Sequence, residues 1–200
     1  MANLKETILN PILKGNPITV LVLGICSSLA VTVQLKGACV MALSVIAVTG
    51  LSSLVVSLLR NTIPNRVRII VQLVVVAMMV ILVDQILKAF AYDVDKQLSV
   101  YIGLIITNCI VMGRIEAFAL GNKPIPSLLD GLANGFGYGL ILVIVAFFRE
   151  LLGSGTIFGL QVLPAGYVPN NLVILPPFAL ILLGCIIWVH RACDKELQEK

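Results

Sequence analysis

Long apolar runs follow one another along this chain, and charged residues separate them. The runs, in order, are 15–35, 37–59, 69–87, 97–113, 131–148 and 171–189. Each approaches the roughly 20 residues that a helix needs to cross about 30 Å of hydrocarbon. The pattern therefore predicts an all-α integral membrane protein with six transmembrane helices, built as a single membrane domain over 1–200.

Two of these runs carry interruptions. Small and polar residues stand at the centre of 15–35, among them Gly24, and the run 97–113 is short and contains Asn108. Irregular backbone at membrane depth is tolerated only where protein buries it or it lines a cavity. We therefore expect helices 1 and 4 to be broken or half-length, and the other four runs to form ordinary spanning helices.

The composition excludes a water-soluble domain. Hydrophobic residues make up 59% of the 200 residues and charged residues 12%, whereas soluble domains carry about 25% charged residues. The net charge of +4 is scattered between apolar runs, which argues against nucleic-acid binding. The polar start, 1–15, has no small-residue cleavage site after the first run, so we expect that run to stay in the membrane.

The charges at the ends of the runs predict the orientation. With six spans, one side of the membrane carries ten basic residues: Lys5, Lys14, Arg60, Arg66, Arg68, Arg114, Lys123, Arg191, Lys195 and Lys200. The other side carries four: Lys36, Lys88, Lys96 and Arg149. Because cytoplasmic loops carry the excess of Lys and Arg, both termini are predicted to be cytoplasmic.

Three spans in each half suggest an internal repeat. Halves with an odd number of spans must be inverted relative to each other if they share a fold. The halves would cover about 15–90 and about 97–190. Cys26 lies in the first run of one half and Cys109 in the first run of the other, and the next run ends at an arginine 34 or 40 residues later. Spacing alone leaves open whether the halves are related.

The chain has five cysteines, and their spacing excludes a C-x-x-C metal or redox motif. Cys26 and Cys109 stand among small or polar residues inside apolar runs, and two thiolates can ligate a soft metal. A four-thiolate iron–sulfur site would need two further ligands from another subunit. The alternative is that both are packing residues, which is how we interpret Cys39, Cys185 and Cys193.

Charged residues within or beside the spans are further candidates. Asp84 would be a candidate for ion passage if it lay at membrane depth. It follows Arg68 by 16 residues, about 24 Å at 1.5 Å per residue, and Lys88 stands four residues further on. We therefore expect an interfacial Asp84–Lys88 ion pair. Arg114 and Glu116 either cap a broken helix, contact a partner or lie in a solvated loop, and the loop is the expectation.

A glycine ladder marks the fifth run. Gly131, Gly135 and Gly139 recur at every fourth position, a small-xxx-small pattern typical of closely packed membrane helices. It is not a phosphate-binding loop, because no Lys-Ser/Thr ending follows it. The single histidine, His190, stands beside Trp188 near the end of the last run, where interfacial anchoring explains both residues.

Several stretches together resemble one known family. They are Asn16–Ile18, Leu23–Thr32, Val56–Pro64, Val83–Ala89, Ile105–Ala119 and Phe147–Gly155. The chain is similar, nearly end to end, to the related membrane subunits of the sodium-translocating NADH:quinone reductase (Nqr) and of the Rnf ferredoxin:NAD oxidoreductase. The stretch Thr107–Arg114 is specific to the family. The stretch Val83–Ala89 and the residues after Arg149 look more like the Nqr branch.

The resemblance implies a six-helix inverted-repeat subunit in a bacterial inner membrane. Such a subunit pairs with its homologue NqrE, which has the opposite orientation, and works with the Nqr subunits A, B, C and F in the lipid bilayer, with no nucleic-acid partner. It also implies that Cys26 and Cys109, with two cysteines of the partner, hold an iron centre, taken as a [2Fe-2S] cluster. The family implies no catalytic residue on this chain.

The same resemblance implies the reaction. The centre relays electrons between flavins on other subunits while the complex, an NADH:ubiquinone reductase, oxidises NADH, reduces ubiquinone and exports sodium. The NAD, flavin and quinone sites belong to other subunits. Three alternatives stay open: an RnfE-like subunit of a ferredoxin:NAD oxidoreductase, a transporter or ion-conducting subunit without a redox centre, and a passive scaffold. Cys26 and Cys109 distinguish the redox subunit from the last two.

Overall fold

A computed structural model of the chain describes residues 16–64, 66–90, 103–157, 160–161 and 171–193. Its elements are α2 (Ile25–Val31), α3 (Leu35–Leu59), α4 (Arg68–Phe90), α6 (Cys109–Arg114), the π-helix η1 (Ile115–Ala119), α7 (Pro124–Gly153), β1 (Thr156–Ile157), β2 (Leu160–Gln161), α8 (Asn171–Ile174) and α9 (Pro176–Cys193). The two short strands pair antiparallel. The predicted cytoplasmic termini and the beginning of the run 97–113 lie outside the described residues.

The described helices agree with a membrane protein. Three of them are long and apolar enough to cross a bilayer: Leu35–Leu59, Arg68–Ile86 and Pro124–Gly153. A fourth apolar helix, Pro176–Ala192, is shorter. Large hydrophobic side chains such as Ile69 are exposed along α4, as expected where lipid or another subunit takes the place of water. The predicted class, an all-α integral membrane protein, is confirmed.

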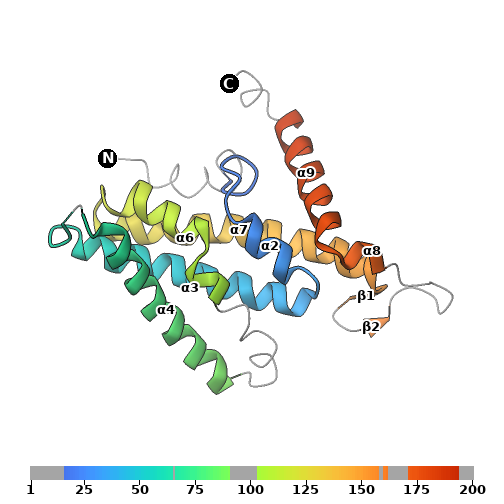
Figure 1. Cartoon of the computed structure of the whole chain (residues 1–200), viewed down its shortest axis with the longest axis horizontal. Coiled ribbons are helices and arrows are strands. Elements are labelled where there is room, and N and C mark those ends of the chain that lie inside the picture. The colour runs from blue at the N-terminus through green and yellow to red at the C-terminus, as the bar shows by residue number, and fades with distance from the viewer. Residues whose placement is uncertain (1–15, 65, 91–102, 158–159, 162–170, 194–200) are drawn as a thin grey trace.

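The long helices α3 and α7 form the centre of the fold and run side by side (Figure 1). The glycine ladder of α7 makes this contact. A Cβ atom added at Gly131 would lie 2.8 Å from the carbonyl oxygen of Thr49, and one added at Gly135 would lie 2.9 Å from Cα of Ile46. Only glycine allows two helix backbones to approach this closely. The predicted role of the ladder in helix packing is confirmed.

The helices follow the same order in each half of the chain. In the first half, the short helix α2 lies against the central pair, the long helix α3 follows, and α4 splays away from the pair. In the second half, α6, α7 and α9 take the same places (Figure 1). The contacts cross between halves, since α2 contacts α9 and α6 contacts α4. The expectation that the first and fourth helices are broken or half-length is confirmed, because α2 has seven residues and α6 six.

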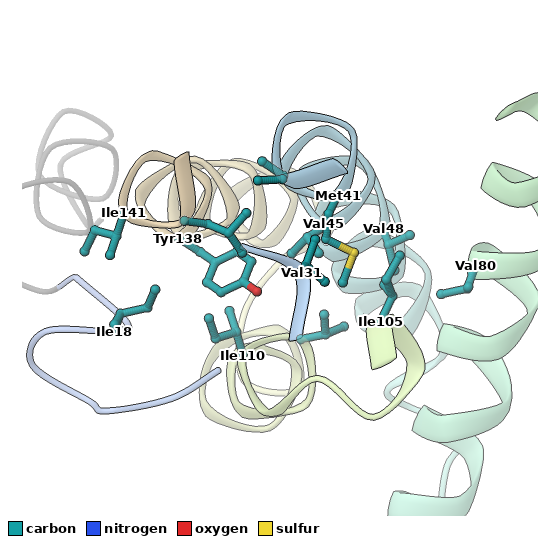
Figure 2. Close-up of a cluster of buried hydrophobic side chains, with 14 of the residues drawn as sticks. Ile18, Val31, Met41, Val45, Val48, Val80, Ile105, Ile110, Tyr138 and Ile141 are labelled. Carbon is teal, nitrogen blue, oxygen red and sulfur yellow. The ribbon is translucent and has the colours of Figure 1, made fainter. Parts of the chain in front are cut away.

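One hydrophobic cluster fills the space between these elements. Figure 2 shows Met41 and Val45 of α3, Ile110 of α6 and Tyr138 of α7 directed toward a common centre. Ile18, from the segment that precedes α2, belongs to the same cluster. The short helices are therefore held by side-chain packing from α3 and α7.

Two of the predicted runs differ from the structure. The run 131–148 was expected to begin after Asp130, but α7 begins at Pro124 and includes Asp130 as a buried residue. The run 171–189 was expected to be one ordinary spanning helix, but α8 ends before α9 begins at Pro176. Proline has no N–H to donate and restricts the residue before it, which explains the break.

Candidate functional site

The start of α2 is fixed by an asparagine and a glycine. Asn16 accepts a hydrogen bond from the backbone N–H of Ile18 at 3.0 Å and donates one to the carbonyl of Gly137 on α7 at 3.1 Å. The chain then passes through Gly24 with φ of 79°, a left-handed conformation that glycine adopts without strain. The helix begins at the next residue, so Cys26 is its second residue.

The start of α6 is fixed by an asparagine cap. Asn108 has extended backbone geometry, and its side-chain oxygen accepts a hydrogen bond from the backbone N–H of Ile110 at 3.2 Å. Such a cap satisfies one of the free donors of a helix N-terminus. Cys109 is therefore the first residue of α6. Both predicted ligands stand at the beginning of a short helix.

The two helix starts pack directly against each other. A Cβ atom added at Gly24 would lie 2.7 Å from Cδ1 of Ile110, and one added at Gly113 would lie 3.2 Å from Cδ1 of Leu23. Gly24 precedes Cys26 by two residues, and Ile110 follows Cys109 directly. The structure thus brings the two cysteine-bearing segments together although the cysteines are 83 positions apart in the sequence.

Both cysteines are exposed free thiols. Cys39 on α3 is half-buried, Cys185 on α9 is exposed, and the side chain of Cys193 lies outside the described residues. Within the part of the chain that the structure describes, no group of three or more His, Cys, Asp or Glu residues could hold a metal ion. The described residues therefore offer a metal the two thiols of Cys26 and Cys109 but no complete ligand set.

Tyr138 joins the first helix start to the central pair. Its side chain is fully buried on α7, and its hydroxyl lies 2.7 Å from Oγ of Ser27, which donates to the carbonyl of Gly24 at 3.0 Å. Figure 2 shows the ring extending from α7 into the space beside Ile110 of α6. The sequence analysis missed Tyr138, because a tyrosine among glycines in an apolar run carries no signal of what it faces.

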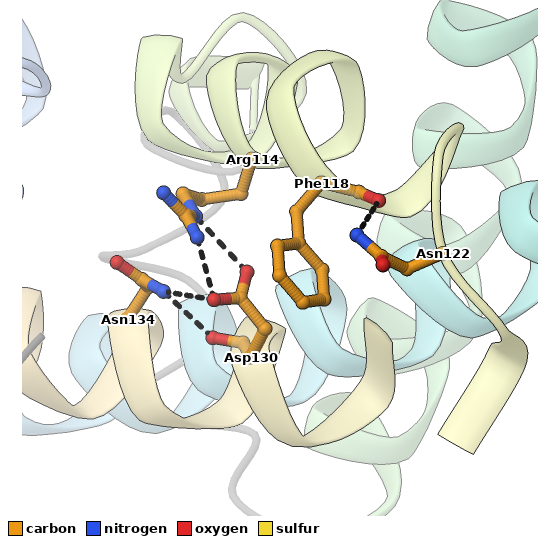
Figure 3. Close-up of polar contacts among 5 residues, drawn as sticks. All are labelled: Arg114, Phe118, Asn122, Asp130 and Asn134. Carbon is orange, nitrogen blue, oxygen red and sulfur yellow. Dashed lines mark hydrogen bonds and ion pairs between the residues drawn. The ribbon is translucent and has the colours of Figure 1, made fainter. Parts of the chain in front are cut away.

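A buried ion pair holds the end of α6 to α7. Arg114 donates from Nε to Asp130 at 3.0 Å and from Nη2 at 2.5 Å, and Asn134 donates to the same carboxylate at 3.1 Å (Figure 3). The guanidinium also lies 5.8 Å from the ring centroid of Phe118. The expectation of a solvated loop at Arg114 is wrong, because the side chain turns inward to a carboxylate with 5% of its side-chain surface exposed.

The structure also differs from the expected solvated loop at Glu116. It lies in the π-helix η1 and accepts hydrogen bonds from Arg68 and from Nε2 of Gln72, the latter at 2.8 Å. Both donors belong to α4. The expectation of a loop is therefore wrong for this residue too, because Glu116 lies in η1 and its carboxylate ties η1 to α4, while 41% of its side-chain surface stays exposed.

The Arg114–Asp130 pair is expected to contribute to stability. We expect Asp130→Asn to lower the free energy of unfolding by about 2 kcal/mol, because it leaves Arg114 without its charged partner. A double-mutant cycle with Arg114→Gln, measured by thermal unfolding in detergent, gives the coupling energy. The Arg68–Glu116 pair, with 39% and 41% of its side-chain surfaces exposed, is the control, with an expected coupling of about 0.5 kcal/mol or less. Equal coupling in the two pairs would contradict this assignment.

An arginine near the end of each long helix contacts the other half of the chain. At the end of α3, Arg60 donates to the carbonyl of Asn122, just before α7, at 2.8 Å. Near the end of α7, Arg149 donates to the carbonyl of Leu29 at 3.1 Å and to Thr32 at 2.6 Å, at the end of α2. These are the two arginines whose spacing from the cysteines suggested a repeat.

The predicted Asp84–Lys88 ion pair is confirmed, since Nζ of Lys88 donates to Oδ2 of Asp84 at 2.5 Å. Asp84 lies in the last two turns of α4. Lys88 follows Asp84 by four residues and lies on the same face of α4, which is the usual spacing of an ion pair along a helix.

Known proteins match this chain over almost its whole length. The Rnf-Nqr family, described as "Rnf-Nqr subunit, membrane protein", matches residues 4–187. A relative from Aeromonas hydrophila subsp. hydrophila is 56% identical over 205 residues, covering 100% of this chain and 98% of its own length. One from Aeromonas salmonicida has the same identity and coverage. Both are named as the D subunit of a Na(+)-translocating NADH-quinone reductase. The resemblance found in the sequence is confirmed.

Proposed function

Because this chain belongs to the Rnf-Nqr family of membrane proteins, we propose that it is the D subunit of a sodium-translocating NADH:quinone reductase. In this proposal it is a membrane subunit of an enzyme that oxidises NADH, reduces ubiquinone and exports sodium. It holds half of an intramembrane iron centre. The two exposed thiols on adjoining helix starts carry the proposal.

The residues fit half of a four-thiolate site. Cys26 and Cys109 come from segments that pack on each other, and both are exposed at the surface of the single chain. Two thiolates are half of the ligand set of a [2Fe-2S] cluster. The other half would come from the homologous subunit NqrE, which would cover this surface. A cluster shared in this way needs no third ligand from this chain.

When bound, the centre supplies one-electron transfer between flavins on other subunits. The residues of this chain hold and surround it. Gly24 and Ile110 keep the two cysteine-bearing segments in contact, and the apolar cluster beneath them limits the access of water. Burial and hydrogen bonds around an iron–sulfur centre set its potential. The NAD, flavin and quinone sites are assigned to other subunits of the complex.

An inverted repeat is the architecture we propose for the chain, with halves of about 15–90 and about 97–190. Three observations support it. The halves repeat the order of short, long and splayed helix, their contacts cross between halves, and Arg60 and Arg149 occupy equivalent places. A homologous partner of opposite orientation would repeat this arrangement and present its own two helix starts to this surface.

The proposed orientation in the bacterial inner membrane has both termini in the cytoplasm, since ten of the basic residues at the span ends fall on that side. A green fluorescent protein fused after Lys200 is expected to fluoresce, and alkaline phosphatase fused at the same place is expected to be inactive. Phosphatase inserted within 91–96 should be active. The reverse pattern of the two reporters would contradict the orientation.

Iron and acid-labile sulfide analysis of the whole purified complex tests the function. We expect iron to be lost when either Cys26 or Cys109 is replaced. Sodium transport by this chain reconstituted alone would instead favour a transporter without a redox centre.

A further inference from the structure

Tyr138 donates its hydrogen bond toward the cysteine-bearing segment of α2. The hydroxyl of Ser27 donates to the carbonyl of Gly24, so its oxygen is left to accept from the hydroxyl of Tyr138. Burying a hydroxyl in an apolar environment costs free energy unless it is hydrogen-bonded. Cys26 directly precedes Ser27 in α2. The tyrosine therefore fixes the backbone around the first candidate ligand to the central helix α7.

Asn108 directly precedes the second candidate ligand, Cys109. Its side chain is buried and lies beside the hydroxyl of Tyr138. While Oδ1 caps α6, Nδ2 makes no hydrogen bond within the described part of the chain. Leaving a buried donor unpaired is destabilising, so such a group normally has a partner in the assembled protein. Nδ2 carries two N–H groups, so at least one stays open even if the other turns to Tyr138.

We infer that Tyr138, Ser27 and Asn108 form a positioning cluster for the iron centre. Tyr138 connects the start of α2 to α7 through Ser27, and Asn108 caps α6 directly before Cys109, with its Nδ2 left as an open donor beside the second ligand. The inference rests on the proposed function, because it assigns these residues a role toward the centre that Cys26 and Cys109 would hold.

The cluster acts on the potential of the centre. Hydrogen bonds to the sulfur atoms stabilise the more negatively charged, reduced form, so losing a donor lowers the reduction potential. Freeing a helix start instead lets water approach the sulfur atoms, and this raises the potential, because water stabilises the more negatively charged reduced form. None of the three residues is a ligand, so the iron itself stays bound without them.

The test uses the whole purified complex with Tyr138→Phe, Ser27→Ala or Asn108→Ser in this chain. Asn108→Ser keeps a capping oxygen for α6 while removing Nδ2. We expect each variant to keep its iron. In a redox titration followed by electron paramagnetic resonance, Asn108→Ser should give a more negative midpoint potential, because it removes a donor, and Tyr138→Phe and Ser27→Ala a more positive one, because they let water approach the sulfur atoms. Ser28→Ala is the matched control, because Ser28 is buried next to Ser27 but donates only to Ile25 within its own helix.

Unchanged potentials in Ser27→Ala and Asn108→Ser, with iron bound, would overturn the inference. Those two variants also decide the matter if Tyr138→Phe prevents assembly. A shift as large in Ser28→Ala would equally overturn it, since the effect would then come from any lost hydroxyl in α2. If complexes with Cys26→Ala and Cys109→Ala keep their iron, the proposed function fails instead, so the two failures are distinguishable.

Discussion

Replacing either Cys26 or Cys109 with alanine is expected to remove the iron centre and reduce NADH-driven quinone reduction to background. Each substitution takes away a quarter of a four-thiolate ligand set. Both cysteines are exposed on the single chain, so alanine leaves no cavity in the core and the complex should still assemble. The expected pattern is therefore an assembled but inactive complex. Iron content, the spectrum of the centre and quinone reduction are measured on the same preparations.

The chain supplies matched controls for this prediction. Cys39 and Cys185 are also free thiols in apolar helices, but neither stands at the start of α2 or α6. Cys39→Ala and Cys185→Ala are expected to keep iron and activity. Full iron content and activity in both Cys26→Ala and Cys109→Ala would refute the proposed electron-relay role and leave a transporter or a scaffold as the function.

Gly131→Leu is expected to prevent stable folding of the subunit. A Cβ atom at this position would lie 2.8 Å from the carbonyl oxygen of Thr49 and 3.1 Å from Cα of Gly50. Both are backbone atoms of α3, which cannot turn aside as a flexible side chain would. Overpacking typically costs about 1–3 kcal/mol and sometimes more, and here it separates the two central helices. The measurement is the yield and thermal unfolding of the subunit in detergent.

Gly184 provides the comparison for this substitution. It lies on α9, and a Cβ atom added there would meet nothing within 4 Å. Gly184→Leu should therefore leave the yield and the unfolding temperature of the isolated subunit near those of the unchanged chain. Gly131→Ala should fall between the two, because it adds only the Cβ atom. An equal loss at positions 131 and 184 would mean that the α3–α7 contact is not what makes glycine necessary.

Much of the fold was predictable from the order of residues alone. A helix that crosses lipid needs a long uncharged run, so the membrane class and α3 and α4 could be predicted from one-dimensional patterns. Gly24 and Asn108 interrupt such runs, and the structure has broken helices there. Charge was a poorer guide to the ends of helices. Asp130 was interpreted as a boundary and lies inside α7, because a paired charge can be buried in a helix.

The residues of the candidate site were also predictable only in part. Its two cysteines stood out because thiols beside small and polar residues are local features of the sequence. Their neighbours did not, since Tyr138 and Arg149 carry no local sign of what they contact. Arg149 was counted among residues at the membrane surface, but it is 1% exposed and donates to Leu29 and Thr32.

The sequence by itself determined that this chain is a membrane protein, which runs form helices, and where two of those helices are interrupted. Hydrophobic length and helix-breaking residues act locally, so a single run contains that information. Only the tertiary structure decided that the starts of α2 and α6 meet, and that Tyr138 lies beneath them. That meeting needs the close approach of Ile110 to Gly24, as the central pair needs the close approach of α3 to Gly131 and Gly135. Such a distance is set by packing between segments far apart in the chain.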